Sequence, residues 1–149
     1  MIASRAFLLA VFCIASTAAT HFSPCAEGKE PVALRVEGCE DEPCNFYRGE
    51  SVKAQWDFSV VKNTANLKPQ VMVTAAGFTL PYELPEQNAC KSLVNGYCPL
   101  DEGEVVTYGL EMPVQQAYPK LGLLLQFSLV DDSGNVHVCF KLSAQVVDR

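Results

Sequence analysis

Seven cysteines are the residues of this chain whose number and spacing point most directly to chemistry. Cys13 lies in an apolar N-terminal run, and six more follow: Cys25, Cys39, Cys44, Cys90, Cys98 and Cys139. Six cysteines in a secreted chain are typical of a disulfide framework, because an oxidising compartment lets the bridges persist. Oxidation to cystines, rather than thiolate chemistry, is therefore the role that we expect for them.

The spacing of these cysteines favours bridges over a metal site. Sequence alone allows many pairings, but Cys39 lies close to Cys44 in the chain. Cys90 is similarly close to Cys98, and Cys25 and Cys139 then remain. A zinc site is the alternative use of cysteines, and it fits badly because the spacings contain no C-x2-C pair. We expect no metal.

The two histidines are the candidates for a catalytic base. A nucleophilic serine or cysteine needs a base beside it. His21 falls near the predicted mature N-terminus, and His137 falls on the outward side of an alternating segment, where we expect it to be solvated. The chain contains no G-x-S-x-G, no phosphate-binding glycine loop and no H-E-x-x-H. We therefore expect neither enzyme activity nor a cofactor.

Residues 1–19 have the pattern of a secretory signal. Arg5 precedes an apolar run from Ala6 to Ala15, and small residues follow it. The run is shorter than the roughly 20 apolar residues that span a bilayer. We expect cleavage near Ala18 or Ala19, which leaves residues 20–149 as a single secreted domain.

The acidic balance of the chain limits its partners. The formal net charge is −6, and loss of Arg5 makes it −7. Nucleic acids and anionic membranes both attract basic surfaces, so we expect no nucleic acid partner and no standing attachment to anionic lipid. We expect an extracellular protein. The lysosomal lumen is the alternative, although no Asn-x-Ser/Thr sequon supports glycan-dependent delivery there.

Apolar and polar residues alternate with a period of two along much of the chain, which predicts strands with one buried face. The alternation is strong in three segments: Ser51 to Val60, Leu121 to Leu129 and Val136 to Val146. It is weaker in three more: Val32 to Val36, Val71 to Ala75 and Val106 to Met112. The cluster from Asp131 to Asn135 predicts a hairpin turn. Such strands, with no helical period, predict an all-β sandwich of two antiparallel sheets.

Two proline-rich segments, Leu80 to Pro85 and Met112 to Pro119, are predicted to be connecting loops. Proline fixes φ, so the aromatic and aliphatic side chains in these loops are held in place. Rigid apolar loops suit the mouth of a ligand pocket. Loops that only cap a filled core give the same pattern, and periodicity does not distinguish the two.

The cysteines and their neighbours carry a resemblance to a known family. The motifs are Gly38-Cys39, Glu42-Pro43-Cys44, Arg48-Gly49, Asn88 to Ser92, Cys98-Pro99, Ala117-Tyr118-Pro119, Asp131-Asp132 and Cys139-Phe140. With them the chain resembles the ML family of lipid-recognition domains, which includes the Niemann–Pick type C2 sterol carriers and the group 2 mite allergens. The resemblance implies an immunoglobulin-like β-sandwich with an apolar cavity between its sheets. It also implies the pairings Cys25–Cys139, Cys39–Cys44 and Cys90–Cys98.

The resemblance implies ligand-binding residues as well. Tyr82, Val114 and Tyr118 match the positions that guard the cavity in the sterol carriers. The period-two alternation adds candidates for the cavity wall, because it places them on the inward side of their strands. They are Trp56, Phe58, Val73, Leu110, Phe127 and Phe140. The sterol carriers have phenylalanine where this chain has Tyr82. A hydroxyl at the rim could bond a head group, so fatty acids and other amphiphiles compete with sterol as the ligand.

The resemblance implies a secreted monomer that binds a sterol, a fatty acid or a similar apolar molecule and carries it. A membrane or a membrane protein would then act as donor or acceptor. One alternative is an innate-immune module that binds microbial lipid, such as endotoxin, and presents it to a receptor. Another is a carrier of apolar chemical signals.

Overall fold

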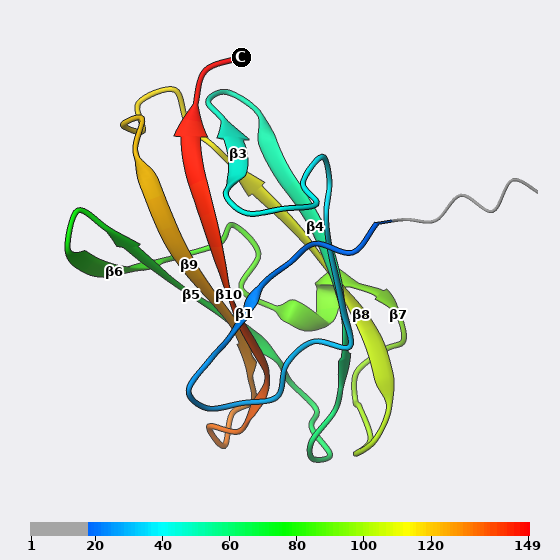
Figure 1. Cartoon of the computed structure of the whole chain (residues 1–149). Helices are drawn as coiled ribbons and strands as arrows, with labels where there is room; N and C mark the ends of the chain where they lie inside the picture. Colours follow the sequence, from blue (N-terminus) through cyan, green and yellow to red (C-terminus); the bar gives the residue numbers. More distant parts are fainter. Residues whose placement is uncertain (1–17) are drawn as a thin grey trace, which may run out of the picture.

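The computed structural model describes residues 18–149 as two β-sheets packed face to face (Figure 1). The first sheet has six strands. Five follow one another in the order β1 (Ser23–Pro24), β10 (Val136–Val147), β9 (Gly122–Val130), β5 (Lys68–Ala75) and β6 (Phe78–Tyr82), and the sixth, β3 (Cys44–Tyr47), also pairs with β10. The second consists of β2 (Ala33–Val36), β4 (Ser51–Ser59), β8 (Val105–Pro113) and β7 (Leu93–Asn95). The all-β sandwich is confirmed. Apart from the last two residues, the predicted signal lies outside the described residues.

One pair of strands departs from the predicted antiparallel arrangement. β3 (Cys44–Tyr47) runs parallel to the end of β10, with Cys44 opposite Ala144 and Tyr47 opposite Val147. A short 3₁₀ helix, η1 (Ala89–Ser92), precedes β7. Within residues 18–149 no helix has the length and apolar content needed to cross a membrane.

The six alternating segments correspond to β2, β4, β5, β8, β9 and β10. Burial along β4 follows the alternation, with Val52, Ala54, Trp56 and Phe58 buried. The opposite strand β8 places Tyr108 across from Trp56, so the two apolar faces lie on the same side of the sheet. The other four strands have two to five residues each, too few for alternation to reveal.

Two predictions from parity are wrong. Val32 was expected to face inward, but it precedes β2 and is 65% exposed. His137 was expected to be solvated, but its exposed fraction is 0%. The register of β10 against β9 shifts between Val136 and Val138, as at a β-bulge. The irregular start of β10 directs the His137 side chain under the loop that follows β4, where it accepts a hydrogen bond from Val61 N–H.

All three disulfides implied by the family resemblance are confirmed. Cys25–Cys139 joins the N-terminal segment to β10 over a sequence separation of 114. Cys39–Cys44 closes the turn before β3, and Cys90–Cys98 links η1 to the segment after β7. Cys44 is buried in the apolar core, and Cys39, Cys90 and Cys98 pack against it.

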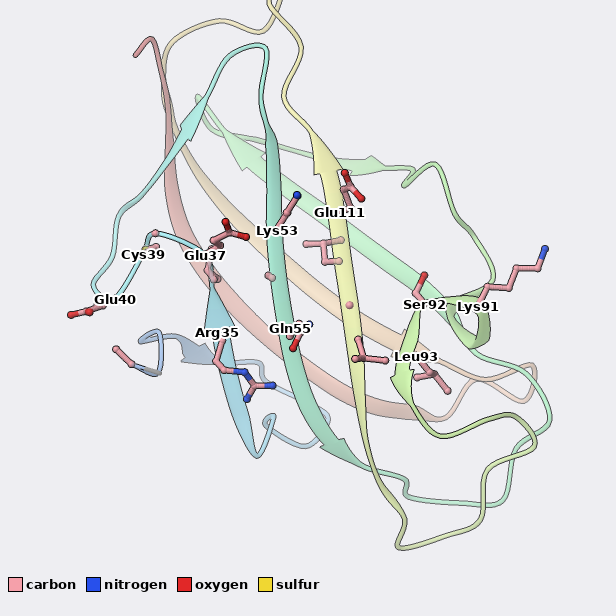
Figure 2. A pocket seen from close by; sticks show the side chains of 17 residues that line it. Arg35, Glu37, Cys39, Glu40, Lys53, Gln55, Lys91, Ser92, Leu93 and Glu111 are labelled. Atoms are coloured by element: carbon pink, nitrogen blue, oxygen red, sulfur yellow. The ribbon is translucent and has the colours of Figure 1, made fainter. Parts of the chain in front are cut away.

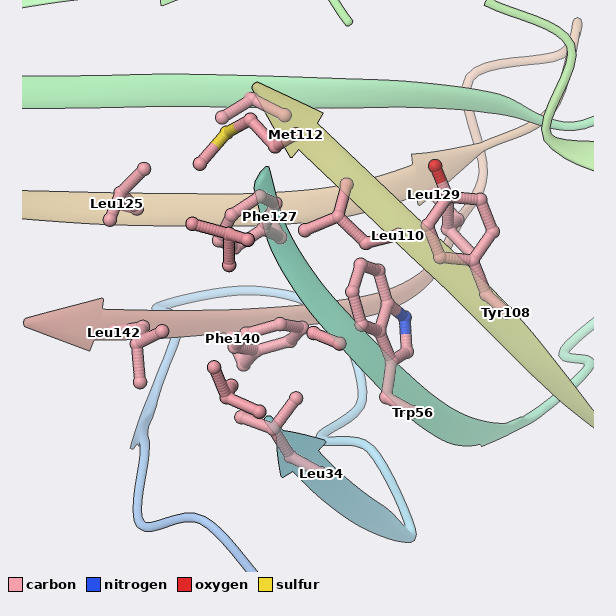
Figure 3. Packing of buried hydrophobic residues seen from close by; sticks show 14 of the residues in the cluster. Leu34, Trp56, Tyr108, Leu110, Met112, Leu125, Phe127, Leu129, Phe140 and Leu142 are labelled. Carbon is pink, nitrogen blue, oxygen red and sulfur yellow. The ribbon is translucent and has the colours of Figure 1, made fainter. Parts of the chain in front are cut away.

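Aromatic side chains from both sheets form the centre of the core (Figure 3). The ring centroids of Trp56 and Phe140 lie 4.9 Å apart, and those of Trp56 and Tyr108 lie 4.6 Å apart. Phe127 stacks on Phe140 at 5.3 Å. Tilted and offset contacts of this kind add to the stabilisation that burial provides.

Candidate functional site

The nine predicted ligand-binding residues all belong to one apolar cluster between the sheets or pack directly against it. Six are buried in the cluster: Trp56, Phe58, Leu110, Val114, Phe127 and Phe140. Val73, Tyr82 and Tyr118 are half-buried at its margin. Residues that lie far apart in the sequence thus share one surface, with a deep aromatic part and a partly open rim.

The inner face of the first sheet becomes steadily more exposed toward β6. Leu142, Leu125, Val73 and Leu80 occupy successive strands in register, so their side chains face the same side. Leu142 and Leu125 are 2% and 1% exposed, Val73 is half-buried, and Leu80 is 65% exposed. The second sheet therefore covers β9 and β10 but leaves the apolar inner face of β6 open.

Strand β6 was not predicted. Its residues Leu80, Pro81 and Tyr82 were assigned to a proline-stiffened loop, but they pair with β5 at the edge of the sheet. An edge strand tolerates proline because it need not donate on its outer side. Sequence reasoning also missed Phe78, which is 73% exposed on the same face as Leu80. No charged residue occurs between Lys68 and Glu83, a signal that could have marked this apolar hairpin.

Two tyrosine side chains provide polar groups at the rim. Tyr82 comes from β6, and Tyr118 comes from the loop between β8 and β9. Burial, with a further effect from the neighbouring Tyr118 hydroxyl, raises the pKa of Tyr82 to about 12. Tyr82 therefore stays protonated at neutral pH and can donate a hydrogen bond as well as accept one.

The loop that carries Val114 and Tyr118 is held by the Arg48-Gly49 segment. Gly49 N donates to Val114 O at 2.6 Å. The Arg48 guanidinium donates to the carbonyl oxygens of Gln116, at 3.3 Å, and Tyr118, at 3.4 Å. Arg48 also forms an ion pair with Asp148 near the C-terminus. The position of Tyr118 at the rim therefore depends on contacts from a distant part of the sequence.

A hollow of about 940 Å³ lies on the outer face of the second sheet, away from the predicted site (Figure 2). Its lining includes side chains of both charges, among them Arg35, Lys53 and Glu111. Arg35 is already engaged in a two-bond contact with Asp57, at 2.9 and 3.1 Å. The charged walls make this hollow unsuitable for a purely apolar ligand, so volume alone does not identify the apolar site.

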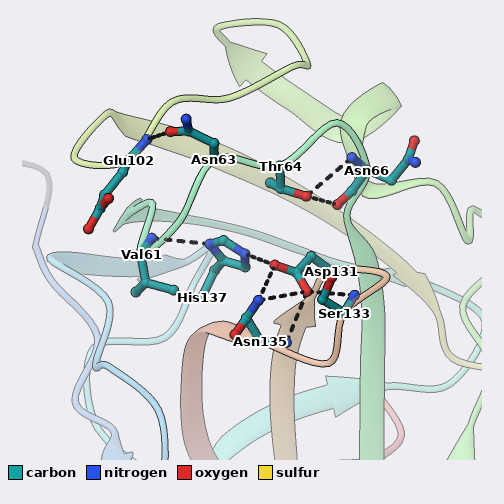
Figure 4. Close-up of polar contacts among 9 residues, drawn as sticks. All are labelled: Val61, Asn63, Thr64, Asn66, Glu102, Asp131, Ser133, Asn135 and His137. Carbon is teal, nitrogen blue, oxygen red and sulfur yellow. Dashed lines mark hydrogen bonds and ion pairs between the residues drawn. The ribbon is translucent and has the colours of Figure 1, made fainter.

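His137 and Asp131 form a buried pair that resembles part of a catalytic site (Figure 4). His137 Nε2 lies 2.9 Å from Asp131 Oδ2, and Nδ1 accepts from Val61 N–H at 3.2 Å. Both ring nitrogens are therefore engaged, and the imidazole has no free position to activate a nucleophile. The pair instead ties the β9–β10 turn to the loop after β4.

The same turn explains the ionisation of Asp131. Burial alone would raise the pKa of Asp131, but hydrogen bonds from His137, Asn135 and Ser133 lower it to about 2. Asp131 Oδ1 accepts from the backbone N–H of Ser133 and of Asn135, which confirms the predicted hairpin turn. Among the described residues, no group of three or more histidine, cysteine or acidic side chains could hold a metal ion.

Comparison with known proteins identifies the family. The family model of the ML domain matches residues 19–146, and the chain therefore belongs to the ML domain family. NPC intracellular cholesterol transporter 2 of Mus musculus is 27% identical over 146 residues, with 97% of each chain covered. The resemblance found in the cysteine motifs is confirmed.

Two solved structures share the fold. A Niemann-Pick type C2 protein from Japanese carpenter ant has a TM-score of 0.76 and 20% identity, covering 85% of this chain and 99% of that chain. Chicken MD-1, solved in complex with lipid IVa, has a TM-score of 0.53 and 14% identity, covering 74% of this chain and 78% of that chain. The immunoglobulin-like arrangement of the sheets is confirmed by these likenesses.

Proposed function

We propose that this protein is a secreted carrier that holds a sterol, a fatty acid or a comparable amphiphile between its two sheets and does not alter it chemically. One observation carries the proposal: a continuous apolar surface runs from the buried Trp56 and Phe127 to the uncovered Leu80 on β6. An exposed apolar surface that continues into the core is typical of a ligand site rather than of a fully closed sandwich.

The hydrophobic effect supplies the affinity in this proposal. Each Å² of apolar surface that a ligand buries contributes roughly 25 cal/mol. Tyr82 and Tyr118 would bond the polar end of the ligand at the rim, since both hydroxyls lie where the apolar surface becomes exposed. An amphiphile fits this combination better than a purely polar molecule.

The comparisons support an apolar, lipid-like ligand. A mouse relative that spans the whole domain is named as a cholesterol transporter, and MD-1, with the same fold, is solved with lipid IVa. Three disulfides favour an oxidising extracellular or lumenal compartment. We infer that the carrier works as a monomer and exchanges its ligand with membranes or membrane proteins.

Uptake of fluorescent lipids by delipidated protein tests the proposal. We expect a fluorescent sterol or fatty acid to bind, and Val114→Phe and Tyr118→Ala to weaken the binding because they fill or remove parts of the site. Val94→Phe is a matched control, since Val94 lies on the outer side of β7 and is 59% exposed. Equal uptake in all variants would remove Val114 and Tyr118 from the site, and no uptake would refute the carrier.

A second candidate function is presentation of a microbial lipid to a protein partner. The likeness to MD-1 with its lipid IVa favours it. Endotoxin-loaded and empty protein, each immobilised and exposed to candidate receptors, separate the two functions. Partner capture that depends on endotoxin favours presentation, whereas tight sterol binding with no partner favours the carrier.

A further inference from the structure

Trp56 Nε1 is a hydrogen-bond donor without a partner in the middle of the apolar cluster. Trp56 is 1% exposed, and among the described residues its indole nitrogen is the only buried side-chain nitrogen or oxygen without a hydrogen bond. Both nitrogens of the equally buried His137 have partners. Because buried polar groups are almost always paired, an orphaned donor at this position calls for an explanation.

The surroundings of Trp56 place its ring, which carries this donor, beside the proposed path of the ligand. Tyr82 at the rim, Val71 and Phe127 occupy successive strands in register, and Phe127 contacts Trp56 with ring centroids 5.7 Å apart. Two strand spacings, about 10 Å, separate the rim strand from the strand of Phe127. The indole nitrogen lies on the side of the ring that faces Tyr108 (Figure 3). An aromatic ring is only a weak acceptor, so this neighbour does not replace a hydrogen bond.

We propose that Trp56 Nε1–H donates a hydrogen bond to an oxygen atom of the bound ligand, and that the site thereby selects lipids with a neutral oxygen on the part buried between the sheets. The inference rests on the proposed carrier function and deepens it by naming the ligand class. Long-chain ketones, alcohols and esters belong to this class, and plain hydrocarbons do not.

The charge of the cluster explains why the oxygen should be neutral. The buried polar residues among those described are Thr20, Thr107, Ser128, Asp131 and His137, with no lysine or arginine. A buried carboxylate would therefore lack a cation, and its desolvation would be costly. A ketone, alcohol or ester oxygen needs one donor only, which Trp56 supplies.

The experiment uses the indole as its own reporter. Trp56 is the only tryptophan, so uniformly ¹⁵N-labelled protein gives a single indole N–H cross-peak. Delipidated protein is titrated with a long-chain methyl ketone and with the alkane of the same length. We expect the ketone to move the indole proton downfield and to bind about tenfold more tightly, as one neutral hydrogen bond allows. The alkane should leave the proton without a downfield shift.

Two variants separate the indole from its neighbour. Trp56→Phe should remove the preference for ketone over alkane, whereas Tyr108→Phe, which deletes the adjacent hydroxyl, should retain it. Equal binding of ketone and alkane with an unmoved cross-peak in the wild-type protein would overturn the inference and leave the carrier standing. If neither compound binds, and fluorescent sterol and fatty acid do not bind either, both proposals fail. The wild-type titration decides the question even if Trp56→Phe does not fold.

Discussion

Arg48 and Asp148, which are 100 residues apart in the sequence, form a two-bond ion pair beside the rim of the candidate site. Arg48 Nε lies 2.6 Å from Asp148 Oδ1, and Nη2 lies 2.8 Å from Oδ2. The remaining guanidinium nitrogen binds the loop that carries Tyr118. Two-bond contacts between arginine and carboxylate fix orientation as well as distance. The C-terminal end of the chain thus helps to position the rim.

Loosening this pair should speed the release of ligand. Asp148→Asn keeps the shape of the side chain but removes its charge, so the Arg48 guanidinium is held less firmly. We expect the dissociation rate of a fluorescent fatty acid to rise about fivefold, in a stopped-flow displacement assay. Glu50→Gln, which weakens the exposed contact with Arg149 instead, is the control. An unchanged rate in Asp148→Asn would show that the pair does not control release.

Substitution on the inner side of β6 should reduce affinity, and substitution on its outer side should not. Leu80 faces the same side as Val73, whereas its neighbour Thr79 pairs with Thr74 on the other side. Leu80→Gln makes the open part of the apolar surface polar, and we expect affinity for the fluorescent lipid to fall about fivefold. Thr79→Gln should bind as the wild type does. Equal effects of the two substitutions would contradict the assignment of this strand to the site.

Asp131 should stabilise the fold only above a defined pH. Its pKa is lowered to about 2 from the ordinary 3.8, so its stabilising effect is complete above pH 3.8 and is lost as the pH falls to about 2. A shift of this size corresponds to about 2 kcal/mol. Asp131→Asn should lower the free energy of unfolding by about that amount at pH 7 and by much less near pH 2, as measured by urea denaturation. The neighbouring exposed Asp132→Asn serves as control, and a pH-independent difference would exclude the linkage.

The three disulfides should differ in their contributions to stability. Cys25–Cys139 closes a loop with a separation of 114, whereas Cys39–Cys44 closes one of 5. In the chain-entropy model these closures contribute about 5 and about 2 kcal/mol. We therefore expect the double serine variant of Cys25 and Cys139 to unfold at a markedly lower denaturant concentration than that of Cys39 and Cys44. The reverse order would mean that native contacts around the bridges outweigh loop closure.

The sequence was sufficient to predict the long strands and the buried residues of the core. A period of two persists through β4, β8, β9 and most of β10, because one side of each strand is buried. The same parity identified Trp56, Phe127 and Phe140 as inward-facing, and all three meet in one cluster. Within the three strongly alternating segments, His137 is the residue whose predicted side the structure contradicts.

The features that could not be predicted depend on contacts between distant segments. The β-bulge that buries His137 arises from the pairing of β10 with β9. The backbone N–H that donates to the His137 ring belongs to Val61, in the loop that follows β4 of the other sheet. Strand β6 contains proline and exposes its apolar side chains, so its composition resembles a loop. That Trp56 Nε1 has no hydrogen-bond partner likewise depends on how the interior packs, and no sequence pattern indicates it.

Native mass spectrometry of the protein from its natural source tests the central claim most directly. The claim predicts a population heavier than the chain with its three disulfides by the mass of one lipid, which organic extraction removes. Fragmentation of that lipid would also identify the ligand. Protein that carries no lipid from its source, and that takes up none of the sterols, fatty acids, ketones or alkanes after extraction, would contradict the account.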